Sequence, residues 1–280
     1  MKISDTIYKQ SNIKIWNEIA PRYHKRWARV SEGPFQSTSK LVELVNVTKG
    51  NSVLDLACGT GVVTKEISDK VGDSGYVVGA DASFTAIKIA KKWNSVKSNL
   101  DFVNIDAEKF SFARKFDIVT CQYGLFFFPK AQKALKNIRN SLKKTGTLGI
   151  SVHGHKDKVP FFSNILDAVM EFIPDYVPSG SPNMDRFGTK SALDNEIRTA
   201  GFSKISIKDF TFSYSPGKFD NYWRNYLKYI AKPLKEKLNS LDISTRKELK
   251  QKVKQNTIPY TKKNEVIVFP WQVLILTAKY

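Results

Sequence analysis

The sequence predicts an α/β fold built on a mainly parallel sheet with crossover helices. Short apolar runs alternate with helical patterns from residue 52 to residue 153, and strands that alternate with helices in this way form parallel sheets. A hydrophobic fraction of 41% over 280 residues is enough for a large buried core. A glycine-rich turn, Gly59-Thr60-Gly61, follows the first of these strands and opens a helix.

The individual elements follow from periodicity and from turn residues. Strands are predicted at 52–57, 75–81, 100–105, 116–121, 147–153, 202–214 and 265–279. Helices are predicted at 5–29, 36–47, 61–71, 83–93, 130–142 and 189–200, with two more in 217–255. We expect Pro21 to break or kink the first helix. The proline- and phenylalanine-rich stretch 154–188 predicts an insertion that packs over the sheet edge.

The composition and charge of the chain bear on its cellular location and on its binding partners. The net charge is +19, and residues 221–263 carry twelve Lys or Arg against three acids. This segment is either a solvated helical face or a surface for anions such as nucleic acid or an acidic membrane. No apolar run is long enough to span a bilayer, and the first residues lack a signal-peptide pattern, so we expect a cytoplasmic protein. Cys58 and Cys121 have no paired spacing, so we predict neither a disulfide nor a metal site.

Acidic residues at three successive strand ends indicate what the glycine loop binds. A dinucleotide loop has a third glycine where this chain has Thr64, and Asp55, just before the loop, would repel a pyrophosphate. Asp55 suits a cationic ligand such as the methionine end of S-adenosylmethionine. Asp81 can accept both ribose hydroxyls, and Asp106 is placed to meet the adenine amine. The predicted site also includes the loop and strand-end neighbours Ala57, Gly59, Gly61, Ala82 and Ala107.

Four segments resemble a known family. Residues 53–61 (Val-Leu-Asp-Leu-Ala-Cys-Gly-Thr-Gly) resemble motif I of class I methyltransferases. Residues 116–129 resemble the fourth-strand motif of the ubiquinone/menaquinone-biosynthesis methylases, the UbiE/COQ5 group, and of their small-molecule relatives. Residues 144–148 and 199–202 resemble the turns before strands five and six. The core resemblance covers roughly residues 36–215.

The resemblance implies a Rossmann-like sheet of seven strands in the order 3-2-1-4-5-7-6, with strand seven antiparallel and helical lid insertions. It implies S-adenosyl-L-methionine as cofactor and S-adenosyl-L-homocysteine as product. It places Gln122 and Tyr123 beside the adenosine. It also matches Trp16 and Tyr23 to a lead-in helix that folds over the cofactor, although plain core packing would explain these two aromatic residues as well.

Four parts of the chain are therefore expected. Residues 1–48 form the helical lead-in, 49–153 the cofactor-binding core and 154–188 a lid insertion. Residues 189–280 complete the core sheet and carry a Lys-rich helical insertion at 217–260.

The acceptor side is less sharply predicted. Methyl transfer is an in-line displacement in which the protein mainly aligns the acceptor and excludes water. A base is needed only if the acceptor must lose a proton. His153 and His155 at the predicted end of strand five are candidate bases, as is Tyr123. Solvated turn histidines and an adenine-facing tyrosine are the alternatives, and for His24 we expect a surface position.

A small-molecule acceptor of quinone-like, lipid-like or anionic character is the favoured function. Methylation of RNA or protein through the basic surface is one alternative, and a non-catalytic module that binds the cofactor is another. Residues 121–124 (Cys-Gln-Tyr-Gly) differ from the Asn/Asp-Pro-Pro-aromatic turn of amino-group methyltransferases for bases, which argues against nucleic acid.

Overall fold

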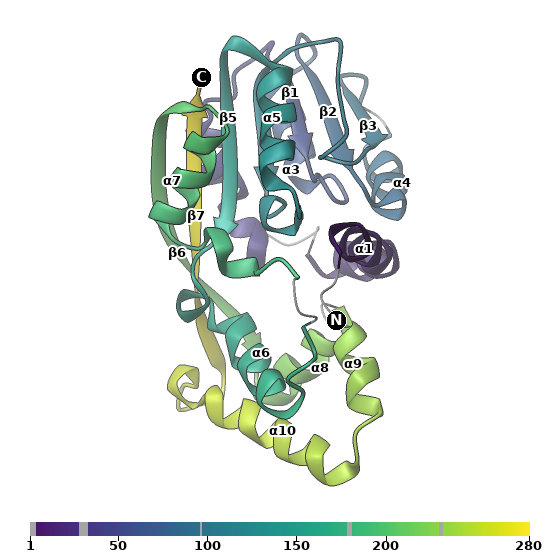
Figure 1. The fold of residues 1–280 in the computed structure, drawn as a ribbon, viewed down its shortest axis with the longest axis vertical. Coiled ribbons are helices and arrows are strands. Elements are labelled where there is room, and N and C mark those ends of the chain that lie inside the picture. Colours follow the sequence, from purple (N-terminus) through teal and green to yellow (C-terminus); the bar gives the residue numbers. More distant parts are fainter. Residues whose placement is uncertain (1–3, 28–32, 96, 178–180, 230–231) are drawn as a thin grey trace.

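The computed structural model describes residues 4–27, 33–95, 97–177, 181–229 and 232–280. Its centre is a single sheet of seven strands (Figure 1). In spatial order these are β3 (Leu100–Asn104), β2 (Tyr76–Asp81), β1 (Ser52–Leu56), β4 (Phe116–Gln122), β5 (Leu142–His153), β7 (Ile267–Lys279) and β6 (Ser203–Gly217). The first five are parallel, and β7 is antiparallel to both β5 and β6. The predicted strand order is confirmed.

Helices cover both faces of the sheet and divide the core in two. Buried residues of α2 (Thr38–Leu44), α3 (Val62–Val71) and α4 (Phe84–Trp93) pack in one cluster. Those of α5 (Ala131–Ser141) and α7 (Lys190–Thr199) pack in the other. The Ser83 hydroxyl accepts the Ala86 N–H at 3.1 Å and caps α4, as a serine before a helical stretch predicts.

The helix α1 (Asp5–Trp27) lies across the carboxyl ends of the strands and packs on α4 (Figure 1). The side-chain oxygen of Asn17 accepts the Ser83 hydroxyl at 2.8 Å and the Thr85 N–H at 3.0 Å. The expected break at Pro21 is wrong, because the helix continues through it. Burial of Ile19 and Ala20 before the proline and of Trp27 after it packs both halves of the helix against the protein and offsets the missing N–H.

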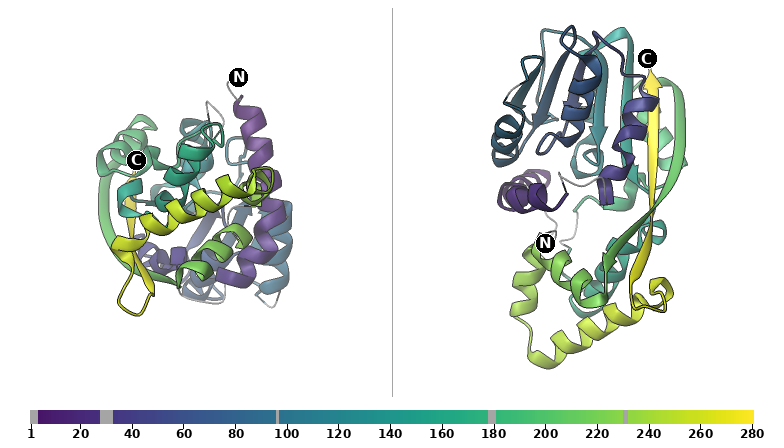
Figure 2. Two further views of the ribbon diagram at one scale, coloured as in Figure 1. Left: turned by 90° about the horizontal axis from the view of Figure 1, so that it is seen from below. Right: turned by 180° about the vertical axis from the view of Figure 1, so that it is seen from behind.

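A helical lobe extends from the end of the sheet. It contains α6 (Pro160–Phe172), α8 (Phe219–Tyr229), α9 (Lys232–Asn239) and α10 (Ile243–Asn256). The long strands β6 and β7 run from the sheet into this lobe (Figure 2). There, fully buried Tyr222, Phe269 and Trp271 join them to the helices, and the Tyr222 hydroxyl donates to the Phe161 carbonyl at 2.5 Å.

The lobe corrects one expectation. Residues 217–255 form three helices rather than two in the described part of the chain. The third, α10, is capped by Asp242, whose carboxylate accepts the Thr245 N–H at 2.9 Å. Within 154–188, Pro160 occupies the first turn of α6, where a proline favours a helix.

Short 3-10 helices connect the larger elements. Those in the described residues are Gly33–Ser37, Leu125–Phe127, Lys156–Lys158, Met184–Phe187 and Ile258–Tyr260. Among the residues that the structure describes, no helix combines the length and the apolar character needed to cross a bilayer.

Candidate active site

The glycine loop leaves β1 with its backbone in the left-handed region. The φ angles are 57° at Ala57, 54° at Gly59 and 86° at Gly61. A Cβ on Gly59 would meet nothing within 4 Å, so its Cα faces open space. A Cβ on Gly61 would lie 2.9 Å from the ring of Phe102. The two glycines therefore serve different needs: Gly59 keeps space for a ligand, and Gly61 lets α3 approach the sheet.

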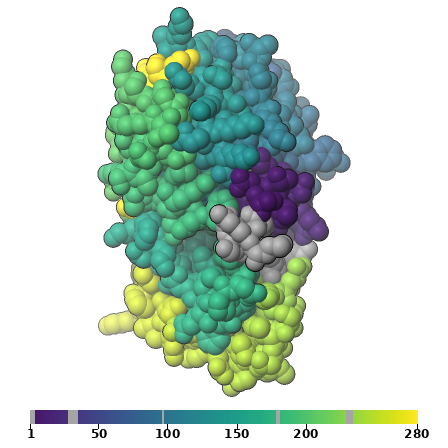
Figure 3. Space-filling model, in the orientation of Figure 1, coloured from purple at the N-terminus to yellow at the C-terminus, as the bar shows by residue number. Residues whose placement is uncertain are grey.

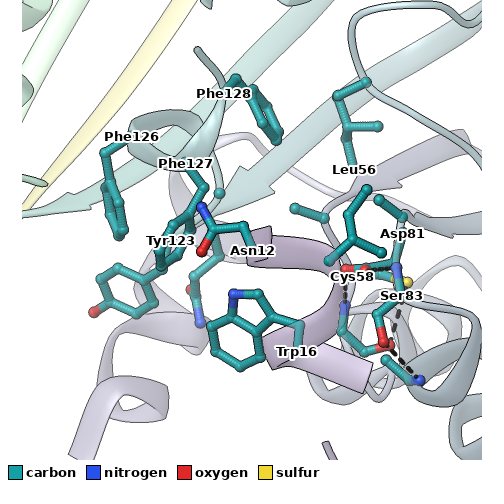
Figure 4. Close-up of a pocket in the computed structure, with 18 of the residues that line it drawn as sticks. Asn12, Trp16, Leu56, Cys58, Asp81, Ser83, Tyr123, Phe126, Phe127 and Phe128 are labelled. Atoms are coloured by element: carbon teal, nitrogen blue, oxygen red, sulfur yellow. Dashed lines mark hydrogen bonds between the residues drawn. The ribbon is translucent and has the colours of Figure 1, made fainter. Parts of the chain in front are cut away.

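A cavity of about 260 Å³ lies between α1 and the carboxyl edge of the sheet. Figure 4 shows Asp81, Cys58 and Ser83 on one side of Trp16, and Tyr123 with the Phe126 and Phe127 rings on the other. The part near the loop is here called the cofactor half, and the part near Tyr123 the acceptor half. In Figure 3, α1 lies between the sheet domain above and the helical lobe below.

The carboxylate of Asp81 forms the floor of the cofactor half. Its two oxygens accept the backbone N–H groups of Gly59 and Ser83, each at 2.8 Å. These contacts tie the end of β2 to the glycine loop and leave lone pairs toward the cavity, which Ala82 also lines. Burial raises the pKa of Asp81 above its ordinary value, so a ligand that donates hydrogen bonds to this carboxylate would be stabilised.

Asp106 follows β3 and lies at the far end of the cofactor half, next to Ala107. Its carboxylate accepts the Glu108 N–H at 2.9 Å and forms an ion pair with Lys9 of α1 at 2.9 Å. Lys9 also pairs with the buried carboxylate of Glu108. The ammonium of Lys9 thus occupies the region where the sequence places an adenine amine, and it fastens α1 over the cavity.

Asp55 lies beneath the loop and does not line the cavity. The Thr64 hydroxyl donates to one of its oxygens at 2.6 Å and the Thr120 hydroxyl to the other at 2.8 Å. The side chain is 1% exposed, and burial raises its pKa to about 6. In this arrangement Asp55 joins β1 to α3 and β4, so its effect on a ligand passes through the shape of the loop.

Aromatic side chains from four elements line the acceptor half. His153 ends β5, and its ring stacks on Tyr123 with the centroids 4.2 Å apart and the planes 15° from parallel. Phe162 of α6 and Trp271 of β7 complete the wall at 5.2 and 5.5 Å from the same ring. The Tyr123 hydroxyl is 2.8 Å from the Ser37 hydroxyl, and burial raises the pKa of Tyr123 above its ordinary value.

The other histidines lie outside the cavity wall. His155 pairs with Asp157 at 2.9 Å on the surface. His24 is half-buried, with its ring edge-on to that of Trp93 at 4.9 Å. Of the three histidines, the fold therefore brings only His153 to the acceptor half.

A sequence model of the ubiE/COQ5 methyltransferase family matches residues 6–215. The chain belongs to this family. It uses S-adenosylmethionine and methylates small molecules, and the cofactor and enzyme class that the sequence predicts are confirmed.

Relatives in the ubiE/COQ5 family share a modest identity with this chain. The demethylmenaquinone methyltransferase of Staphylococcus saprophyticus is 26% identical over 207 residues, which cover 70% of this chain and 84% of that protein. The ubiquinone/menaquinone biosynthesis C-methyltransferase UbiE of Azotobacter vinelandii is 35% identical over 129 residues, or 45% of this chain and 47% of that protein.

Solved structures share the fold. The YcgJ protein from Bacillus subtilis is similar with a TM-score of 0.57 and 18% identity, over 87% of this chain and 98% of that chain. The phosphoethanolamine N-methyltransferase 2 of Haemonchus contortus, in complex with S-adenosyl-L-methionine, has a TM-score of 0.55 and 14% identity, over 99% of this chain and 57% of that chain.

The cofactor half fits S-adenosylmethionine in shape and in unpaired polar groups. The open side of Gly59 leaves space at the loop. Among the residues that the structure describes, the side-chain oxygen of Gln122 and the indole N–H of Trp27 are buried at the cavity without a hydrogen-bond partner, and such atoms usually bind a ligand or water. Gln122, fixed by its amide donation to Thr38 at 2.9 Å, would accept from the ammonium, and Trp27 would donate to the carboxylate.

Sequence reasoning missed several wall residues. Trp27 and Asn12 belong to the helical pattern of α1, and both bring unpaired polar atoms to the cavity. Tyr23, which the family resemblance had already matched to the helix over the cofactor, lines the cavity as well, with its ring 5.4 Å from that of Trp16. The helical periodicity of α1 was a usable signal for these side chains. Trp271 had none, because it is 118 residues from His153 along the chain.

Proposed function

We propose that the enzyme methylates an apolar, ring-shaped acceptor of quinol type that lies against Tyr123, His153, Phe162 and Trp271. The aromatic wall of the acceptor half is the observation that carries this proposal. Flat rings pack well against such a wall, because offset and edge-on contacts between aromatic groups add to apolar burial. The two relatives named above act on menaquinone and ubiquinone precursors according to their names, which agrees with this chemical class.

The wall also bears on how the reaction proceeds. When bound, S-adenosylmethionine supplies an electrophilic methyl group. The protein's part is to hold the ring in line with that group and to exclude water, and α1, fastened by Lys9, closes the cavity on the solvent side. The ring carbon or hydroxyl oxygen that takes up the methyl group becomes strongly acidic and must release one proton, which water can take, so no strong base is needed.

Turnover with defined acceptors tests this proposal. The purified enzyme is incubated with S-adenosylmethionine and either 1,4-naphthohydroquinone, phosphoethanolamine or a mixed RNA, and S-adenosylhomocysteine is measured by mass spectrometry. We expect turnover with the hydroquinone only, and none in the Gly59→Val variant. Turnover with phosphoethanolamine or RNA alone would contradict the proposed acceptor class, and binding of the cofactor without turnover on any acceptor would favour a non-catalytic module.

A further inference from the structure

The ring of His153 is held in one protonation pattern by its neighbour on β7. The indole N–H of Trp271 lies 3.1 Å from the Nδ1 atom of His153. An indole nitrogen only donates, so Nδ1 must be the acceptor and carries no proton. A neutral imidazole then carries its single proton on Nε2.

The surroundings of His153 keep this arrangement rigid. Trp271 is 1% exposed and stacks on Phe161 at 5.2 Å. The ring of His153 also stacks on the ring of Tyr123, whose hydroxyl is hydrogen-bonded to the hydroxyl of Ser37. The ring can therefore neither flip nor turn without breaking several contacts.

The second ring nitrogen is left for the cavity. His153 lines the acceptor half, and Nε2 has no hydrogen-bond partner among the residues that the structure describes. The ring contacts there are to aromatic side chains, with Phe126 at 5.5 Å and Phe162 at 5.2 Å. Nε2–H is thus an unpaired donor in a mainly aromatic wall, and the cavity also holds the Asn12 amide and the Trp27 indole N–H.

We propose that His153 donates a hydrogen bond from Nε2 to an oxygen of the methyl acceptor, and that Trp271 is the positioning residue that fixes it as a donor. Contacts with aromatic side chains alone would let a flat acceptor ring slide, whereas the hydrogen bond from Nε2 would fix one oxygen of that ring. The position of this oxygen would then determine which ring atom faces the methyl group. The inference rests on the proposed acceptor class and replaces the base role that the sequence suggested.

Burial agrees with this assignment. It lowers the pKa of His153 to about 3, so the imidazole stays neutral at ordinary pH. A general base at this position would need a free lone pair on Nδ1 or Nε2. Trp271 occupies the first and the proton occupies the second.

Nitrogen NMR tests the protonation pattern without any turnover. Protein labelled with ¹⁵N-histidine is measured at pH 7 by long-range ¹H–¹⁵N correlation, and the His153 signals are assigned by their loss in His153→Gln. We expect a pyridine-like Nδ1 and a pyrrole-like Nε2. A proton on Nδ1, or an imidazolium, would overturn the inference. In Trp271→Phe, where folding is checked by circular dichroism, we expect the two nitrogen shifts to move toward a tautomer mixture.

Ligand binding tests the donor. 2-Naphthol and naphthalene are titrated into the enzyme saturated with S-adenosylhomocysteine. His153→Phe keeps a flat ring and removes the donor, so it should weaken 2-naphthol about three- to tenfold and leave naphthalene unchanged. His153→Gln retains an N–H and should recover part of the loss.

Equal loss for both probes, or failure of 2-naphthol to bind the wild type, would contradict the donor role. The two tests separate this inference from the proposed function. Absence of turnover with a hydroquinone, together with the expected NMR pattern and probe selectivity, would place the fault with the proposed acceptor and leave the donor role intact.

Discussion

The two halves of the cavity are built in opposite ways. The cofactor half takes its glycine loop and two of its carboxylates, Asp81 and Asp106, from three consecutive strand ends. The acceptor half gathers Tyr123 from the turn after β4 and further rings from β5, α6 and β7. A charged, polar ligand needs a few placed hydrogen bonds, whereas a flat apolar ligand needs a shaped wall. Local sequence therefore encodes the first half, and the tertiary fold makes the second.

The largest expected effect tests whether the cofactor half depends on open space at the loop. In Gly59→Val the side chain would enter the cavity, and we expect affinity for S-adenosylhomocysteine to fall at least about 100-fold. Gly50→Val is the matched control, because Gly50 also has a positive φ, 84°, but its nearest side-chain neighbour is Ser74 at 3.7 Å. Calorimetry should show a loss only for Gly59→Val. A similar loss in both variants would mean that backbone strain, rather than occupied space, weakens binding.

The buried carboxylate of Asp55 lies beneath the glycine loop and supports the cofactor half without lining the cavity. Its pKa of about 6 in the folded protein lies above the ordinary 3.8. The folded state therefore keeps its proton longer than the unfolded state, and stability that is present below pH 4 is lost as the pH rises to 6. Asp55→Asn does not titrate. Relative to wild type, its free energy of unfolding in urea should rise by about 3 kcal/mol from pH 4 to pH 7.

The exposed carboxylate of Asp69 supplies the control for this measurement, and Asp69→Asn should show no such rise. A flat difference between Asp55→Asn and wild type across this range would contradict the buried, proton-retaining state. Affinity of Asp55→Asn for S-adenosylhomocysteine should stay within about threefold of wild type, since Asp55 does not line the cavity.

Unlike Asp55, Asp81 lines the cavity, so its replacement should weaken cofactor binding. In Asp81→Ala we expect affinity for S-adenosylhomocysteine to weaken by about 1–3 kcal/mol, because a buried charged acceptor is lost. Calorimetry at pH 7 measures this directly, with Asp69→Ala as the exposed control. Unchanged affinity in Asp81→Ala would contradict the prediction that Asp81 binds the ribose hydroxyls. The glycine loop would then be the main determinant of cofactor binding.

Sequence reasoning reached the sheet order and the cofactor half because both depend on local signals. The Gly59 turn and Asp81 follow from where strands end, and the carboxyl ends of parallel strands meet at one edge. The side-chain direction of Asp55 could not be read in this way. Its partners Thr64 and Thr120 come from α3 and β4, and only the folded sheet brings them together.

The acceptor half depends on pairings that are distant in the chain. The register of β5 and β7 that places His153 opposite Val273 also places Trp271 beside His153. No local sequence pattern predicts this pairing. The helix through Pro21 shows the same limit on a smaller scale, because tertiary packing there overrides local propensity. The cap of α10 at Asp242 is different, because it is a local contact that a helix-start signal could have predicted.

We expect one cavity to hold the cofactor at the glycine loop and the acceptor at the aromatic wall. A crystal structure with S-adenosylhomocysteine tests this arrangement most directly. We expect the ribose hydroxyls on Asp81, the adenine near Asp106 and the sulfur directed toward His153 and Phe162. Adenine stacked against Trp271, or a sulfur directed away from the aromatic wall, would contradict it.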